Sequence, residues 1–269
     1  MARKVLIRKI YSTGTTYETG ASEVLVIQAI GTNSTYGIKV EVEGAPCCET
    51  IRYLGPLHKD TDEFLDPRPL GDKFVVVLPQ RSFEFTTTGP SANVSVVGYM
   101  LKLAGGEAVP SDLVARYNAQ TKDYLTYVNE SVTVSAGTTI PANGEVTIFT
   151  KQADANETLT FDGMVQAYAE AGGTALAKSN WALRLYVNDK PLDNSLTDAG
   201  NYGLCFYFLP RPPQTGWNLT PFTLKDSPIV LNPGDTLKVT AVNISGSDYV
   251  DDTNDTYFYA TLEMKRVIK

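Results

Sequence analysis

The chain has 269 residues, of which 43% are hydrophobic and 20% charged, so it carries enough apolar material for two domain cores. Its formal net charge of −7 argues against a protein that binds duplex DNA or RNA, because such proteins need clustered cations to displace counterions. The sequence contains no run of apolar residues long enough to cross a membrane as a helix.

Cys47, Cys48 and Cys205 are the only cysteines. A disulfide between adjacent residues is strained, and an odd number leaves at least one thiol unpaired, so we expect all three to be reduced. At the amino terminus, Val5–Ile7 form an apolar core too short for a secretory signal. We therefore expect the protein to be made in the cytoplasm and not exported by this route.

Apolar residues in the first half recur at the period of two that is typical of β-strands. In Tyr36–Glu43, apolar residues alternate with charged ones, which predicts one buried and one solvated face. The predicted strands are Lys4–Ile10, Glu23–Ile30, Tyr36–Glu43, Lys73–Leu78, Ser82–Thr86 and Asn93–Leu103. The Pro-containing stretch Glu49–Asp72 is predicted to be a long loop.

Residues 104–122 interrupt this pattern. Ser111–Asn118 follow Pro110, and Ser111 is a candidate N-cap, so we predict a short helix here. We place the domain junction at this helix, which makes residues 1–120 the first domain and residues 121–269 the second.

The β pattern resumes after the helix. The predicted strands are Tyr124–Val134, Glu145–Thr150, Glu157–Phe161, Val165–Ala169, Trp181–Val187, Leu204–Leu209, Ile229–Leu231, Thr236–Val242 and Thr256–Val267. Their short spacing and the many turn residues favour a sandwich or a barrel. Residues 171–177 are predicted to form a loop that could contain a helical turn.

An internal repeat links the two halves. Val76–Thr86 aligns without gaps with Val230–Thr240, and both segments consist of a strand, a Pro-containing turn and an alternating strand that ends in Thr. A long final strand follows each, at Val96–Lys102 and at Phe258–Lys265. The matching order favours two copies of one fold, although any two β-hairpins can be aligned in this way.

Residues for catalysis are scarce. His58 is the only histidine, and its surroundings do not resemble those of a catalytic triad. One histidine and three cysteines are not at the spacing of a zinc site. We therefore predict that the protein is not an enzyme.

Two acidic segments are candidates for cation binding. Asp248, Asp251, Asp252 and Asp255 lie within eight residues, and flexible oxygen-rich loops of this kind bind Ca²⁺. The spacing is not that of an EF-hand, so a solvated loop is the alternative. The segment from Lys59 to Asp66 is a weaker candidate.

The positive charge is concentrated at Arg3, Lys4, Arg8 and Lys9. These residues could contact anionic lipid headgroups or an acidic partner, or they could protect an edge strand.

Seven Asn-x-Ser/Thr sequons are present, which is typical of a glycosylated surface protein but also follows from the frequent Asn and Thr of a β-protein without a secretory signal. They begin at Asn33, Asn93, Asn129, Asn156, Asn218, Asn243 and Asn254.

Two similar β-sandwiches joined by a short helix, with the repeated elements at Val76–Thr86 and Val230–Thr240, resemble the double jelly-roll major capsid proteins of membrane-containing icosahedral viruses. The length is most similar to that of the corticovirus phage coat. The resemblance covers the whole chain and implies an all-β fold of two tandem jelly rolls. One departure is that the linker helix is short, and the sequence gives no signal that identifies the flanking helices of larger relatives.

This resemblance implies a virion protein in which homotrimers of pseudo-hexagonal outline tile a shell over an internal membrane. It further implies contacts with neighbouring trimers, penton or spike proteins and minor membrane proteins, and none with nucleic acid. Arg3, Lys4, Arg8 and Lys9 would then face the membrane. Coats of this type are associated with calcium, which favours Ca²⁺ as the ligand of Asp248–Asp255.

Other functions remain open. A carbohydrate- or receptor-binding spike or fibre module could use Trp181, Trp217 or tyrosines as a sugar platform. An enzyme on a β-sandwich, such as a lyase or glycosidase, is a third class. The apolar segments Tyr257–Tyr259 and Leu204–Leu209 could belong either to the core or to a trimer interface.

Overall fold

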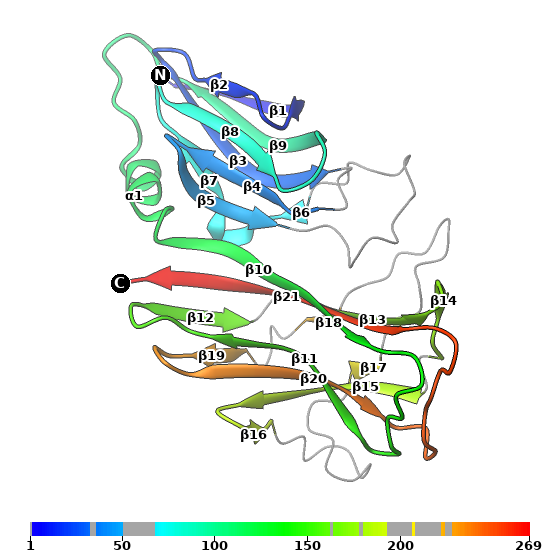
Figure 1. Ribbon diagram of the computed structural model, residues 1–269. Helices are drawn as coiled ribbons and strands as arrows, with labels where there is room; N and C mark the ends of the chain where they lie inside the picture. The colour runs from blue at the N-terminus through cyan, green and yellow to red at the C-terminus, as the bar shows by residue number, and fades with distance from the viewer. Residues whose placement is uncertain are drawn as a thin grey trace. The chain divides into compact units, whose positions relative to one another are not determined.

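The computed structural model describes residues 2–32, 36–50, 68–161, 164–177, 180–192, 206–207, 222–223 and 228–269. The chain forms two compact units (Figure 1). Among the described residues, unit 1 comprises those up to Tyr127 together with Lys265–Lys269, and unit 2 comprises Val128–Met264. The expectation of a mostly β-protein is confirmed, because strands make up most of both units and α1 (Ser111–Ala119) is the single α-helix of the described residues.

Unit 1 contains two antiparallel sheets. The first has the order β1-β9-β3-β6, with β7 also paired to β3, and the second has the order β2-β8-β4-β5. The strands of the first are β1 (Arg3–Ser12), β3 (Glu23–Thr32), β6 (Arg68–Pro69), β7 (Val75–Val77) and β9 (Asn93–Lys102). Those of the second are β2 (Thr16–Glu18), β4 (Ile38–Val42), β5 (Ala45–Thr50) and β8 (Ser82–Thr87), and a 3-10 turn, Gly71–Lys73, precedes β7.

Both sheets of unit 1 contribute to one core. The alternation noted in the sequence places Ile38, Val40 and Val42 of β4 in this core, where they meet residues such as Leu25 and Ile27 of β3. Side chains from facing sheets that share a core make a β-sandwich. All of these side chains are buried, so this sandwich holds the alternating strands in a defined register.

Helix α1 covers the other face of the first sheet. Leu113 packs with Val24, Val26 and Val76, which point away from the main core. After the helix, the buried Gln120 side chain accepts a hydrogen bond from the N–H of Val76 and donates one to its carbonyl, both at 2.8 Å. This side chain therefore satisfies the backbone groups of β7 that no neighbouring strand pairs. The helix begins after Pro110, which is the N-cap and makes no side-chain capping bond, so the expectation that Ser111 caps it is wrong.

Unit 2 also contains two antiparallel sheets. One has the order β14-β13-β21-β12-β19, with β10 paired to β21 and β18 to β13; the other has the order β11-β20-β15-β16, with β17 paired to β15. The first comprises β10 (Asp123–Val134), β12 (Glu157–Phe161), β13 (Met164–Ala171), β14 (Thr174–Ala175), β18 (Phe222–Thr223), β19 (Ile229–Leu231) and β21 (Thr256–Ile268). The second comprises β11 (Glu145–Gln152), β15 (Trp181–Val187), β16 (Lys190–Pro191), β17 (Phe206–Tyr207) and β20 (Thr236–Asn243).

The core of unit 2 is likewise formed by side chains of both sheets. Phe161 of β12 and Phe258 of β21 share it with Trp181 and Leu183 of β15 and Val239 of β20. Phe258 is fully buried, so at least this member of the segment Tyr257–Tyr259 belongs to the core.

Several expectations about local structure need correction. Residues 171–177 form the end of β13, a turn and β14 instead of a helical turn, because Gly172 and Gly173 adopt the left-handed conformation that a tight hairpin needs. The segment expected to be a loop from Glu49 begins inside β5 and ends in β6 and the 3-10 turn. Residues 51–67 of that segment lie outside the described residues.

Candidate functional site

The aspartates of the segment 248–255 in unit 2 bind backbone N–H groups. Asp248 Oδ1 accepts from Ala142 N and Asp255 Oδ1 accepts from Ala136 N, both at 3.0 Å. Asp251 Oδ1 accepts from the N–H groups of Asn254 and Thr253, at 2.8 and 2.9 Å. These two bonds, that of Asn254 first, lower the pKa of Asp251. The carboxylates thus fix the segment to residues 136–142 and close its own turn.

No metal centre forms from these carboxylates. Across the part of the chain that the structure describes, no three His, Cys, Asp or Glu side chains gather in a way that could hold a metal ion. The structure therefore does not bring the four predicted ligands Asp248, Asp251, Asp252 and Asp255 together. The weaker candidate segment, Lys59–Asp66, lies outside the described residues.

The four cations of β1 lie on two sides of the strand, because side chains alternate along it. Arg3 and Lys9 share the side of the buried Tyr11, and Lys9 Nζ lies 4.8 Å from the centroid of that ring. The structure therefore does not bring the four predicted residues together on one face.

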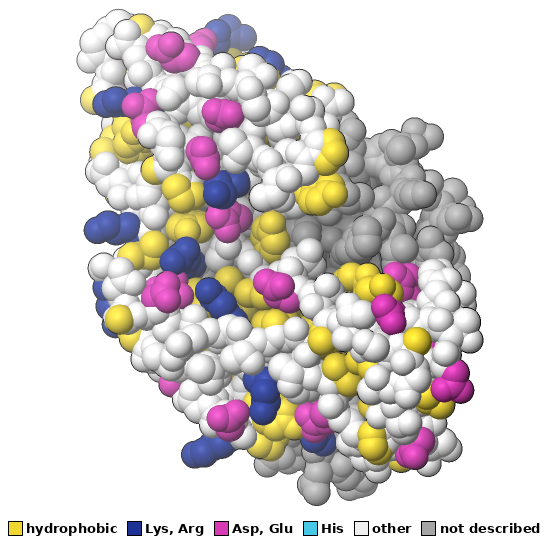
Figure 2. Space-filling model, viewed as in Figure 1, with side chains coloured by type: hydrophobic (Ala, Val, Ile, Leu, Met, Phe, Trp, Pro, Cys, Tyr) yellow, Lys and Arg dark blue, Asp and Glu magenta, His cyan; other side chains and the backbone are white. Residues whose placement is uncertain are grey.

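On the other side of β1, Lys4 and Arg8 alternate with two exposed apolar side chains, Leu6 and Ile10, which are 79% and 56% exposed. We call these four residues the outer face of β1. Lys4 Nζ lies 3.8 Å from the ring centroid of Tyr99, on the neighbouring strand β9. Elsewhere the charges are mixed: Figure 2 shows acidic and basic side chains interspersed over the face that it displays.

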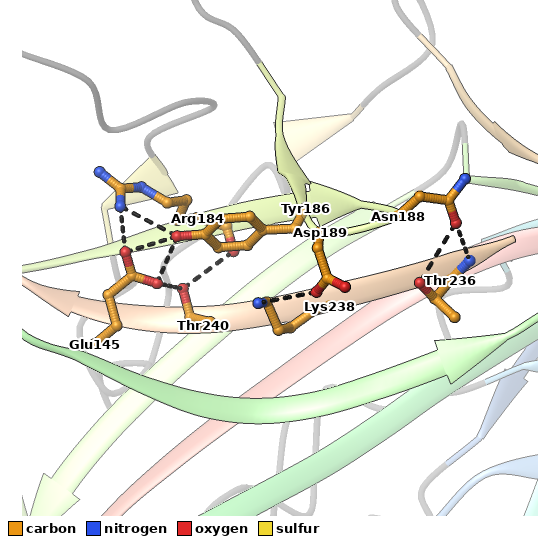
Figure 3. A network of polar contacts seen from close by, with 8 residues as sticks. All are labelled: Glu145, Arg184, Tyr186, Asn188, Asp189, Thr236, Lys238 and Thr240. Carbon is orange, nitrogen blue, oxygen red and sulfur yellow. Dashed lines mark hydrogen bonds and ion pairs between the residues drawn. The ribbon is translucent and has the colours of Figure 1, made fainter.

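A connected set of polar contacts lies on the sheet β11-β20-β15-β16 of unit 2 (Figure 3). Glu145 of β11 accepts hydrogen bonds from Arg184 Nη1, from Tyr186 Oη at 2.7 Å and from Thr240 Oγ1 at 2.9 Å. Arg184 and Tyr186 belong to β15, and Thr240 lies opposite Arg184 on β20. We call these four residues the Glu145 cluster. It joins three neighbouring strands through one carboxylate.

Burial and charge shape the Glu145 cluster. Burial alone would lower the pKa of Arg184, but the hydrogen bond with Tyr186 and the charge of Glu145 together raise it. Burial also raises the pKa of Tyr186, so its phenol remains a donor at neutral pH. Both carboxylate oxygens of Glu145 are occupied by these donors. A carboxylate held in this way stabilises the register of the sheet.

A second group of contacts closes the turn between β15 and β16. Asn188 and Asp189 both have positive φ, as a two-residue hairpin requires. Asn188 Oδ1 accepts from Thr236 N at 2.9 Å, and Lys238 Nζ lies 3.4 Å from Asp189 Oδ1 and 4.3 Å from the ring centroid of Tyr186. Neither this turn nor the Glu145 cluster was predicted from the sequence. The alternation of Arg184 and Tyr186 with Leu183 and Leu185 was the available signal.

The structure describes some of the other residues singled out in the sequence and leaves others outside its described ranges. Trp181 is 1% exposed and packs edge-on against Phe258 and Tyr249, so its expected use as a sugar platform is wrong. Cys47 and Cys48 are buried and are not joined in a disulfide. His58, Cys205 and Trp217 lie outside the described residues. Among the described residues, no helix has the length and apolar character needed to cross a bilayer.

Comparisons with known proteins identify no family. No protein-family model matches the chain, and no curated protein matches it. Its structure is similar to that of PNGase F, a glycosylasparaginase from Flavobacterium meningosepticum, at 12% identity over 100% of this chain and 99% of that chain, with a TM-score of 0.28. It is also similar to BuGH86 in complex with neoagarooctaose, at 9% identity over 96% of this chain and 33% of that chain, with a TM-score of 0.19. Scores this low support no conclusion about fold or function.

Proposed function

We propose that the chain is a structural coat protein built from two tandem jelly rolls. The strand order of unit 1 supports this. Its principal described strands, taken along the chain, are β1, β2, β3, β4, β5, β7, β8 and β9. One sheet contains the first, eighth, third and sixth of these in that order, and the other contains the second, seventh, fourth and fifth. An eight-stranded jelly roll has this arrangement, in which every pair of consecutive strands except the fourth and fifth lies in different sheets.

The strand order of unit 2 matches that of unit 1. Strand β10 pairs with β21, β21 with β12 and β12 with β19, which are the first, eighth, third and sixth positions. On the other sheet, β11, β20, β15 and β16 take the second, seventh, fourth and fifth positions. Strand β13 also pairs with β21 and continues the third position after β12.

The sequence repeat falls on equivalent strands of the two units. Val76–Thr86 runs from β7 to β8, and Val230–Thr240 runs from β19 to β20, which are the sixth and seventh positions in both. This coincidence of repeat and topology is the observation on which the proposal rests. Two equivalent jelly rolls joined by a short helix are what the resemblance to double jelly-roll capsid proteins implies.

We further propose that three chains form a pseudo-hexagonal trimer and that such trimers tile a shell over a membrane. In a closed ring, each subunit presents two different surfaces to its neighbours, and obligate contacts of this kind bury large areas. The Glu145 cluster supports a structural role, because its carboxylate joins three neighbouring strands of one sheet.

Assembly tests this function directly. Purified protein should sediment as a trimer and form hexagonal sheets in negative-stain electron microscopy. The same samples with Ca²⁺ and with a chelator test whether the aspartates at 248–255 contribute to assembly. A protein that stays monomeric at high concentration under both conditions would contradict the proposal.

The outer face of β1 suits contact with anionic lipid headgroups. Leu6 and Ile10 can enter the membrane–water interface while Lys4 and Arg8 contact the negatively charged headgroups. This attraction contributes about 1 kcal/mol of membrane-binding free energy for each basic residue. We expect the protein to cosediment with vesicles that contain phosphatidylglycerol and much less with phosphatidylcholine alone. Replacing Leu6 and Ile10 together by Ser should reduce this binding several-fold.

Val230 of unit 2 provides the matched control, because it is 47% exposed but has no basic residues beside it on β19. Val230→Ser should leave vesicle binding unchanged. Equal binding of the double variant and the unchanged protein would show that β1 does not contact the lipid.

A further inference from the structure

A pocket of about 410 Å³ opens on the second sheet of unit 1. Its walls come from β4, β5, β8 and the start of β10, and the lining residues are Gly37, Ile38, Lys39, Glu49, Thr86, Thr87, Thr88 and Tyr127. Lys39 of β4 lies between Thr86 of β8 and Glu49 of β5 in the strand register, so these three side chains are cross-strand neighbours. The volume is within the range of small-molecule sites.

Tyr127 forms one wall of the pocket, and glycine at position 37 makes room for it. A Cβ atom at Gly37 would overlap the hydroxyl of Tyr127, so any other residue would displace the ring. Burial, and secondarily the charge of Glu49, raise the pKa of Tyr127. Its phenol therefore remains protonated at neutral pH and can donate a hydrogen bond.

Glu49 is held in place by a neighbour outside the pocket. The buried Thr126 donates a hydrogen bond of 2.6 Å to Glu49 Oε2. The other oxygen, Oε1, lies 3.8 Å from Lys39 Nζ, which is an ion-pair distance but too long for a hydrogen bond. Glu49 therefore retains acceptor capacity that faces the pocket.

The pocket contains both donors and acceptors. Besides Glu49, Lys39 and Tyr127, its lining includes three consecutive threonines. Of these, the hydroxyl of Thr87 accepts from the N–H of Gly89 at 3.3 Å, while those of Thr86 and Thr88 make no hydrogen bond to any residue that the structure describes. A ligand could therefore exchange several hydrogen bonds with this wall without displacing existing ones.

The charges favour a neutral ligand. Lys39 Nζ lies 3.8 Å from both Glu41 and Glu49, so the local sum is one negative charge. An anion would be repelled by the two carboxylates, and a cation would have to compete with the lysine already beside them.

We propose that this pocket binds a neutral saccharide unit. Sugar hydroxyls donate to Glu49 and exchange hydrogen bonds with Thr86 and Thr88, and the ring of Tyr127 offers an apolar face for the C–H side of the sugar. The site lies within unit 1, so it does not depend on the assembly of a shell. It adds a glycan-binding activity to the proposed structural role.

Saturation-transfer NMR and titration calorimetry with the methyl glycosides of glucose, galactose, mannose and N-acetylglucosamine test the proposal. At millimolar ligand, at least one should bind. Glu49→Gln and Tyr127→Phe should each weaken that binding by about tenfold, because each removes one hydrogen-bonding group of the pocket.

Glu84→Gln is the matched control. Glu84 belongs to β8 of the same sheet and accepts from Thr16 Oγ1 at 3.4 Å, but it does not line the pocket, so its replacement should leave binding unchanged. Thermal unfolding at the same temperature as the unchanged protein verifies that each variant is folded. The proposal is overturned if none of the four glycosides binds, or if binding is the same in both pocket variants as in the control.

Discussion

Cys47 shows how a residue can be buried for packing and thereby lose its reactivity. Its side chain is fully buried in the core of unit 1, and this burial raises the pKa of the thiol from 9.0 to about 11. The thiol is therefore protonated at neutral pH, and only the thiolate is a good nucleophile. We expect iodoacetamide at pH 8 to modify Cys47 only after denaturation, which peptide mass spectrometry measures. Rapid labelling of the native protein would contradict the buried position.

The same shift makes stability depend on alkaline pH. The folded state favours the neutral thiol of Cys47. The contribution of this group to the free energy of unfolding is therefore complete below pH 9 and is lost as the pH rises toward about 11. The loss has an upper bound of roughly 2–3 kcal/mol for a shift of this size. Urea unfolding at pH 8.5 and 10.5 should show a larger decrease for the unchanged protein than for Cys47→Ala, in which this group does not titrate.

At the scale of elements, the pairing of β3 with β9 depends on one glycine. Gly98 lies opposite a register shift between Ile27 and Ala29, and a Cβ atom there would overlap the carbonyl oxygen of Val26. A bulge of this kind needs a close backbone approach. Gly98→Ala should therefore destabilise unit 1 by about 3 kcal/mol, as measured by urea unfolding.

Gly105 is the matched control for this change. It is exposed, and a Cβ atom added there meets nothing within 4 Å. Gly105→Ala should change the free energy of unfolding by less than about 0.5 kcal/mol. Equal effects at the two positions would show that the bulge does not require glycine.

At the scale of the whole molecule, the chain returns to unit 1 at its carboxyl end. The last five residues, Lys265–Lys269, belong to unit 1, although the rest of β21 belongs to unit 2. Within unit 1, Ile268 N donates to Lys122 O at 2.6 Å, and Lys265 Nζ lies 3.4 Å from Asp72 Oδ1. Unit 1 is therefore built from the first part of the chain together with its last five residues.

A chain that ends at Met264 tests whether the last five residues stabilise unit 1. It loses these contacts, so unit 1 should be destabilised by about 2 kcal/mol while unit 2 keeps its stability. Both tryptophans lie in the segment Val128–Met264, so tryptophan fluorescence follows unit 2, and hydrogen exchange of β1 and β3 follows unit 1. A shift of the fluorescence transition to a lower urea concentration would contradict the assignment of these residues to unit 1.

The sequence alone determined several strands with an alternating or a continuously apolar pattern, because such patterns depend on neighbouring residues only. Glu157–Phe161, Trp181–Val187 and Ile229–Leu231 were predicted with the bounds observed, and α1 with a difference of one residue. Strand β5 was missed because Pro46 and the two cysteines give no alternating signal, although both thiols lie in the core.

Only the tertiary structure decided how the polar side chains are used. Asp248 and Asp255 are close in sequence, but their partners are backbone N–H groups 106 and 119 residues away, which only the fold brings to them. The Glu145 cluster joins strands that are 39 or more residues apart, and the pocket at Glu49 requires Tyr127 from β10. Hydrogen bonds between distant residues depend on strand register and sheet order, and local composition carries no information about either.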